Sequence, residues 1–183
     1  MIDIDYVRTM VVYGSWMNRR LLEASAAVPD SDRRRDMGAF FKSLHGTLDH
    51  LLWGDLIWMQ RFIGSPVLQP SPDGLICPAW DDLAAQRAAA DAHMLHWAEN
   101  QLTVEWLAAP LRYGSTLARR QRIMPAWVLV THMLNHGTHH RGQATTLMKQ
   151  LGVDPGVTDL VAMPALFDGS LGIVAQDEPW DGE

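Results

Sequence analysis

The stretch THMLNHGTHHRGQ, residues 131–143, decides the fold prediction because it has the pattern of an amphipathic helix with histidines on its apolar face. It places four of the chain's eight histidines within nine residues. On a helix, residues four apart share one face, with Cβ atoms about 5–6 Å apart. His136 and His140 can therefore present imidazole nitrogens to one metal ion, and imidazole commonly binds zinc, nickel, copper and iron.

The two histidines interrupt a row of residues spaced three and four apart along the predicted helix. The members of this row are Leu129, Met133, His136, His140, Gln143 and Leu147. A buried imidazole without a partner costs about 1–3 kcal/mol. The spacing leaves two interpretations open, a shared metal ion or two core histidines bonded to neighbouring helices or water. His132 is expected to be a packed or rim residue, whereas His139 lies on a flank, with a supporting, interface or surface role.

Composition favours an ordinary globular chain, which we expect to form a single domain over residues 1–183. Hydrophobic residues make up 48% and the net charge is −6, so disorder and a nucleic-acid partner are both disfavoured. The arginine-rich segments 33–35 and 119–122 are interpreted as solvated turns.

One cysteine, no visible secretory signal and no long apolar run predict a soluble cytoplasmic protein with no membrane partner. Cys77 lies in a proline-rich loop, and it is read as an incidental loop residue, with a reactive thiol as the alternative.

Four segments show helical periodicity: residues 4–27, 36–63, 80–109 and 125–151. In the first, an apolar stripe is formed by Tyr6, Met10, Tyr13, Met17 and Leu21. The connection 64–78 is long and predicts a crossover along the bundle, while residues 111–123 predict a short hairpin or a loop. A further short helix is expected near residues 158–162. The prediction is an all-α, four-helix bundle, because that arrangement buries all four stripes.

The second predicted helix carries two more histidines, His45 and His50. Gly46 and Gly54 lie four residues on either side of His50, on nearly the same face. Each glycine costs about 1 kcal/mol of helix propensity relative to alanine. That cost favours a close approach of another helix to this face. His45 falls on a different face and is interpreted as a buried or boundary residue.

Several motifs together resemble the DinB/YfiT-like family of metal-binding four-helix bundles, which is unrelated to the DNA polymerase that shares the DinB name. They are HLLWGDLIW at 50–58, NHGTHHRGQ at 135–143 and YGSWMNRRL at 13–21. The closing segments GVDP at 152–155 and TDL at 158–160 also fit the family. The motifs occur in the expected order over nearly the whole chain.

The resemblance implies three metal ligands, His50, His136 and His140, and a homodimer as the usual assembly. Three protein ligands leave a coordination position open, as in catalytic metal sites. Zinc or nickel is expected first, with iron or manganese as alternatives.

Relatives of this fold include thiol S-transferases and a mycothiol-dependent maleylpyruvate isomerase. By analogy, the expected function is a divalent-metal-dependent hydrolase or thiol-dependent transferase acting on a small molecule, with a low-molecular-weight thiol as a candidate partner. The alternatives are a non-catalytic metal- or ligand-binding stress-response protein and a purely structural set of core histidines.

Other polar residues near these motifs have weaker expected roles. Asp55 lies about 140° around the helix from His50, so a cap or an ion pair is expected rather than ligation. Asp49 and Asn135 are candidates to orient an imidazole N–H. Arg141 pairs either with a substrate anion or with a structural carboxylate. Four aromatic residues are candidates for the pocket mouth, with most expected in the core: Tyr13, Trp16, Trp53 and Trp58.

Overall fold

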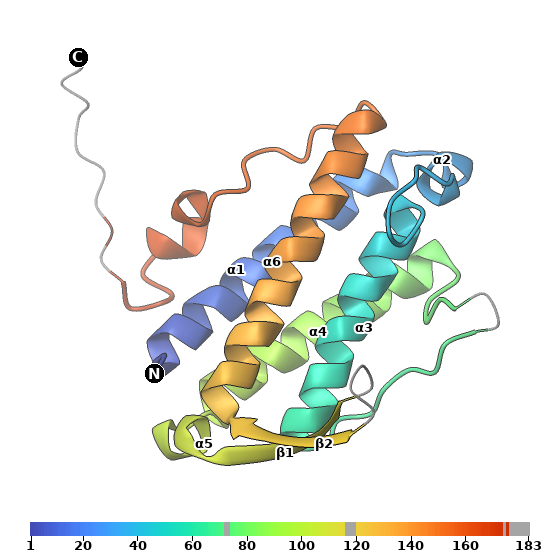
Figure 1. Ribbon diagram of the computed structural model, residues 1–183. Helices are drawn as coiled ribbons and strands as arrows, with labels where there is room; N and C mark the ends of the chain where they lie inside the picture. Colours follow the sequence, from blue (N-terminus) through green and yellow to red (C-terminus); the bar gives the residue numbers. More distant parts are fainter. Residues whose placement is uncertain (72–73, 116–119, 174, 176–183) are drawn as a thin grey trace.

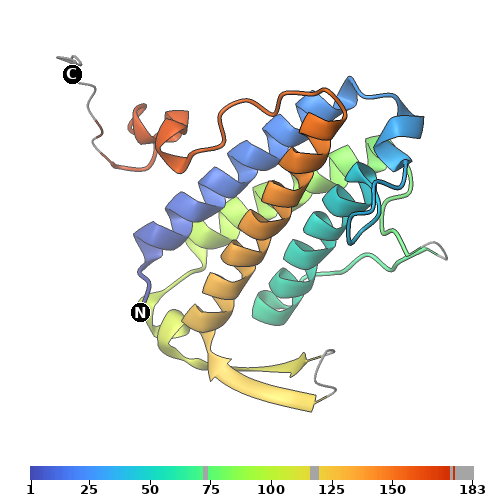
Figure 2. The same cartoon turned by 45° about the horizontal axis from the view of Figure 1, so that its top comes forward.

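The computed structural model describes residues 1–71, 74–115, 120–173 and 175, and it is an all-α bundle as predicted. Its four long helices are α1 (Ile4–Ala26), α3 (Leu44–Ile63), α4 (Trp80–Asn100) and α6 (Ala126–Gln150). Helix α6 packs against α1 and α3, and α4 packs against the same two helices from the other side (Figures 1 and 2). Two short helices, α2 (Asp30–Arg34) and α5 (Val104–Ala108), interrupt the connections.

The long helices follow an up-down-down-up order, because α3 and α4 run in the same direction (Figure 1). The connection between Ile63 and Trp80 therefore returns along the length of the bundle, as the sequence predicted. Strands β1 (Pro110–Ser115) and β2 (Arg120–Pro125) pair in antiparallel fashion, which is the hairpin alternative of the two predicted for residues 111–123. The hairpin lies at the end of the bundle near the C-terminus of α3, where the Arg61 guanidinium donates to the Gly114 carbonyl at 3.3 Å.

The predicted second helix, 36–63, is too long at its start. Helix α3 begins at Leu44, where the Ser43 hydroxyl accepts a hydrogen bond from the Gly46 N–H at 3.1 Å. Residues 37–43 form a loop, in which Gly38 and Lys42 have φ values of 72° and 66°. Such left-handed residues are incompatible with a continuing α-helix. We call residues 37–43 the pre-α3 loop.

The predicted third helix, 80–109, is also too long. It ends at Asn100, and the Thr103 hydroxyl then caps the separate helix α5 by accepting from the Trp106 N–H at 3.1 Å. The tail is close to expectation, with two single-turn 3₁₀ helices at Leu160–Ala162 and Pro164–Leu166.

The two arginine-rich segments have different environments. Arg33 is buried and donates to the backbone carbonyls of Ser25 and Val28, so its prediction as a solvated residue was wrong. Arg120 is exposed and Arg122 is half-buried, and both lie on strand β2 rather than in the predicted turn, whereas Arg119 lies outside the described residues. The acidic tail after Gln176 also lies outside them.

Apolar side chains form two separate core clusters, one toward each end of the bundle. Val11, Trp58 and Leu134 belong to the first cluster. The second contains Leu52 and Ala144. Between them, the central turns of the helices carry a buried polar layer: Asn18, Asp55, Arg87, Asp91, His140 and Arg141. The candidate site lies at this level of the bundle.

None of the helices in the described part of the chain combines the length and the apolar character that a membrane crossing requires.

Candidate metal centre

Helices α3 and α6 bring together three imidazoles that are far apart in the sequence. His50 comes from α3, and His136 and His140 come from adjacent turns of α6. The Nε2 atom of His136 lies 3.3 Å from Nε2 of His50 and 3.0 Å from Nε2 of His140. The donor nitrogens of the three rings all lie within 4.8 Å of one another. No other set of three such donors is grouped in this way among the described residues.

Glycine at position 54 makes this convergence possible. A Cβ atom there would lie 2.6 Å from Cε1 and 3.0 Å from Nδ1 of His136, well inside van der Waals contact. The predicted close approach of a neighbouring helix is therefore found at Gly54. At Gly46 the neighbour is not a helix, because a Cβ there would lie 2.4 Å from the backbone carbonyl oxygen of Phe41 in the pre-α3 loop.

Two of the three donor separations, and the chemistry of the donors, are compatible with a tetrahedral metal ion. Zinc–nitrogen bonds of about 2.0–2.1 Å place adjacent ligand nitrogens about 3.3–3.4 Å apart in a tetrahedron. The His136 Nε2 separations of 3.3 and 3.0 Å are close to that value, and the donors of His50 and His140 lie within 4.8 Å of each other. A set of three neutral imidazoles suits zinc, nickel, iron or copper rather than calcium or magnesium.

Burial keeps the three rings uncharged at neutral pH. Desolvation, reinforced by the nearby His140, lowers the pKa of His50 to about 4. Desolvation also lowers the pKa of His136 to about 3, with His140 and His50 adding to the effect. The pKa of His140 is lowered by burial as well, against an opposing effect of its hydrogen bond to Gln143. Each neutral ring has one nitrogen lone pair to offer to a cation.

The Gln143 side chain fixes which nitrogen of His140 is free. Its Oε1 atom lies 2.8 Å from Nδ1 of His140. An amide oxygen can only accept, so the His140 proton is on Nδ1 and the Nε2 lone pair faces the other two rings. The Gln143 amide nitrogen donates to Nε2 of His139 at 3.1 Å, which connects that exposed histidine to the centre through Gln143.

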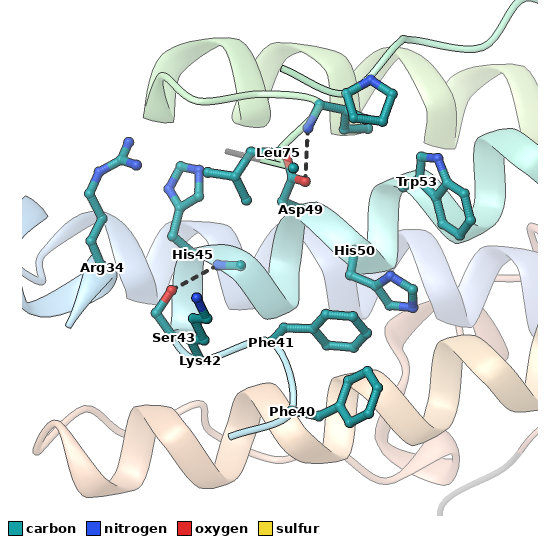
Figure 3. Close-up of a pocket in the computed structure, with 14 residues that line it drawn as sticks. Arg34, Phe40, Phe41, Lys42, Ser43, His45, Asp49, His50, Trp53 and Leu75 are labelled. Atoms are coloured by element: carbon teal, nitrogen blue, oxygen red, sulfur yellow. Dashed lines mark hydrogen bonds between the residues drawn. The ribbon is translucent and has the colours of Figure 1, made fainter. Parts of the chain in front are cut away.

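Aromatic side chains form the wall next to the three histidines. The Phe41 ring stacks on His50 with centroids 3.8 Å apart and meets His140 edge-on at 5.4 Å. Trp53 lies on the other flank, with its centroid 5.6 Å from that of His50. Figure 3 shows the Phe40 and Phe41 rings beside the His50 imidazole.

A pocket of about 510 Å³ opens beside His50, within the usual size range of small-molecule sites. Its walls come from three parts of the chain. They are the end of α2 and the pre-α3 loop, the first turns of α3, and residues 70 and 74–76 of the connection to α4. The lining is mainly apolar, with Lys42, Arg34 and Asp49 as its charged members (Figure 3).

The two candidates for orienting an imidazole N–H, Asp49 and Asn135, have different surroundings. The Asp49 carboxylate accepts from the backbone N–H groups of Ile76 and Cys77 at 3.0 and 2.7 Å, which ties the connection to α3. Asn135 is exposed. His45 is buried, as predicted, and its Nε2 donates to the Cys77 carbonyl at 2.8 Å.

The remaining charged candidates belong to the polar layer. Asp55 forms an ion pair with Arg87 at 2.7 Å, which is one of the two roles predicted for it. Arg87 also pairs with Asp91 at 2.7 Å, and Asn18 donates to Asp91 at 2.9 Å. Arg141 is buried against the Tyr13 ring and does not line the pocket, so it is not placed to meet a substrate there.

His132 and the four aromatic candidates lie mostly as expected. His132 is exposed at the rim, with its ring 5.1 Å from that of Trp58. The core contains Tyr13, Trp16 and Trp58, whereas half-buried Trp53 lines the pocket. Reasoning from the sequence missed Phe41 and Lys42, which fell inside the predicted second helix, 36–63. It also gave Gln143 no role, although a position three residues after His140 is within reach of that ring.

The fold and the site thus define an all-α bundle with a three-histidine centre that could hold a metal. The sequence model of the DinB family matches residues 1–168, and the chain belongs to this family. It is 25% identical over 166 residues to Protein DinB of Bacillus subtilis (strain 168), covering 85% of this chain and 91% of that protein. The fold is similar to the crystal structure of a DinB-like protein from Bacillus cereus ATCC 10987. The TM-score is 0.57 at 18% identity, covering 78% of this chain and 91% of the other.

Proposed function

We propose that His50, His136 and His140 bind one divalent transition-metal ion. We further propose that the loaded protein is a metal-dependent hydrolase or thiol-dependent transferase acting on a small molecule. The observation that carries the proposal is the convergence of three neutral imidazole nitrogens at the edge of a pocket of about 510 Å³. Zinc or nickel suits this donor set first, with iron or manganese as alternatives.

The chain's own residues prepare the site for such chemistry. Gln143 holds the His140 ring in one tautomer, and Gly54 leaves room for the His136 ring. The Phe41 ring stacks on one face of His50. A bound divalent cation would supply Lewis acidity, favouring the deprotonated form of a water or thiol ligand and polarising a carbonyl group.

The first experiment measures metal content. Protein purified without chelators or an affinity tag is analysed for transition elements, beside the His140→Ala variant. We expect about one ion per chain in the wild type and a large loss in the variant. A correctly folded wild type without any bound transition metal would overturn the proposal and favour structural core histidines.

The second experiment tests turnover. Metal-loaded protein is screened against thiols combined with electrophiles, and against esters and amides, with His140→Ala as the control. Metal-dependent turnover that the variant lacks supports the enzyme. Tight metal binding without turnover across these panels would favour a non-catalytic metal- or ligand-binding protein instead.

The homodimer, the single domain and the cytoplasmic location stay predictions. Analytical ultracentrifugation of the metal-loaded protein tests the first, with twice the 20.5 kDa chain mass as the expected result and a monomer as the contrary one.

A further inference from the structure

The pocket beside the three histidines carries different chemistry at its two ends. Phe40, Phe41 and Trp53 gather around His50, whereas Lys42 and Arg34 lie toward the opposite end (Figure 3). A molecule that fills the pocket from the histidines outward therefore meets aromatic side chains first and cationic ones afterwards.

Of the charged side chains that line the pocket, two are already engaged. The Arg34 guanidinium forms an ion pair with Asp30 at 2.8 Å and also donates to the Pro78 carbonyl. The Asp49 carboxylate accepts from two backbone N–H groups of the connection. Lys42 makes no ion pair with any residue that the structure describes. Its ammonium group is the cation of the pocket that is available to an anion.

The backbone at Lys42 is a second, independent observation. Its φ of 66° is the only left-handed value at a non-glycine residue in the described chain. L residues other than Asn and Asp rarely adopt this conformation, and such residues concentrate at ligand-binding positions. The Lys42 N–H donates to the Ala39 carbonyl at 2.8 Å, and its carbonyl accepts from the Met37 N–H at 2.7 Å. These two backbone hydrogen bonds therefore hold Lys42 in a left-handed conformation that is unfavourable for a lysine.

We propose that Lys42 is the anion-recognising residue of this site. The substrate class is then a small molecule with a metal-binding donor such as a thiol at one end, an apolar middle and a carboxylate at the other. A single ammonium group matches a singly charged carboxylate, and the aromatic wall matches the apolar middle. The inference rests on the proposed function, because the first end needs the metal.

The test uses the cobalt(II)-loaded protein and two thiols that differ only at the far end, 6-sulfanylhexanoate and 6-sulfanylhexan-1-ol. Charge-transfer absorption between thiolate and cobalt reports binding of either one without any turnover. We expect the wild type to bind the carboxylate about five-fold more tightly, the upper range for an exposed ion pair, and less so at high salt.

Variants separate the charge from the fold. Lys42→Asn removes the charge but tolerates the left-handed backbone, so the five-fold preference should vanish, whereas Lys42→Arg should keep it. The chain has only one other lysine, Lys149, which is exposed on α6 and pairs with Asp154. Lys149→Gln removes the same charge far from the pocket and should keep the preference. Circular dichroism confirms that each variant is folded.

The outcomes separate the inference from the proposed function. Equal binding of both thiols by the wild type, or an unchanged preference in Lys42→Asn, would overturn the role of Lys42 and leave the metal site intact. If neither thiol perturbs the cobalt spectrum of a loaded protein, the thiol arm of the proposed function fails, and the substrate class inferred here fails with it.

Discussion

The substitution Gly54→Ala tests the geometry of the centre without touching a proposed ligand. The new Cβ would lie 2.6 Å from Cε1 of His136, whereas carbon atoms in contact are normally about 3.5–4.0 Å apart. The ring must therefore retreat by about 1 Å, several times the tolerance of about 0.2 Å for a metal–ligand distance. Changes to groups that merely support a ligand weaken metal binding about 10–100-fold, so we expect a loss of at least about 100-fold.

The stability of Gly54→Ala should change much less than its affinity for metal. Alanine improves helix propensity by about 1 kcal/mol, while overpacking costs about 1–3 kcal/mol. The free energy of unfolding of the metal-free protein should therefore fall by only about 0–2 kcal/mol. Zinc affinity is measured by competition with a chromophoric chelator, and stability by urea titration followed by circular dichroism.

Gly142→Ala is the matched control. Gly142 also lies within a helix, two residues after His140, but no described atom beyond its chain neighbours and the nearby backbone of its own helix lies within 4 Å of a Cβ built there. This variant should gain about 1 kcal/mol in the free energy of unfolding and keep its zinc affinity. If Gly54→Ala binds zinc as tightly as the wild type, or if both variants lose it equally, the packing argument is wrong.

Four further substitutions or labelling tests address other parts of the structure. Gln143→Leu removes the acceptor for the Nδ1 proton of His140, so zinc affinity should fall about 10–100-fold. Gln143→Glu restores an acceptor and should restore the affinity. Equal losses of zinc affinity in both variants would refute control of the tautomer by Gln143. His50→Ala should abolish stoichiometric zinc in elemental analysis, whereas His45→Ala should keep the zinc. His45→Ala should instead lower the free energy of unfolding in urea by about 1–3 kcal/mol. Equal effects of the two variants on zinc content would refute the choice of His50 as the ligand. Asp55→Ala should lower the free energy of unfolding in urea by about 3 kcal/mol, since its buried arginine keeps one other carboxylate; a change near zero would contradict the importance of that ion pair. Burial raises the pKa of the Cys77 thiol to about 11, so about one thiol in a thousand is ionised at pH 8, and iodoacetamide should label the native protein far more slowly than the unfolded one.

The helical framework could be predicted from the sequence because local rules determine it. The fourth predicted helix, 125–151, is within one residue of α6 at either end, and Gly152 follows it with a φ of 77° in the expected capping position. The i, i+4 spacing correctly placed His136 and His140 on one face. That His50 meets them from 86 residues away was implied only by the family resemblance, because periodicity within one helix cannot determine which other helix faces it.

The pre-α3 loop could not be predicted because two patterns compete there. Phe41 continues the apolar spacing of α3, so periodicity extends the helix back to residue 36. The Ser43 cap and the left-handed Lys42 end it instead, and Gly46 then accommodates the Phe41 carbonyl. Asp49 was a candidate to orient an imidazole, and its hydrogen bonds to the backbone of the connection could not be predicted, because the path of that connection depends on tertiary packing.

The proposed metal ligands and the wall of the pocket come from two different kinds of structure, long helices and connecting segments. The histidines stand on long helices that the core holds rigid, while most of the pocket wall comes from a short loop and a connecting segment. Replacements in such segments disturb the core little, because connections tolerate sequence change better than the elements they join. Relatives with the same three histidines can therefore diverge in what they recognise through a handful of loop residues. Laboratory evolution of new specificity would best start by randomising positions 40–42.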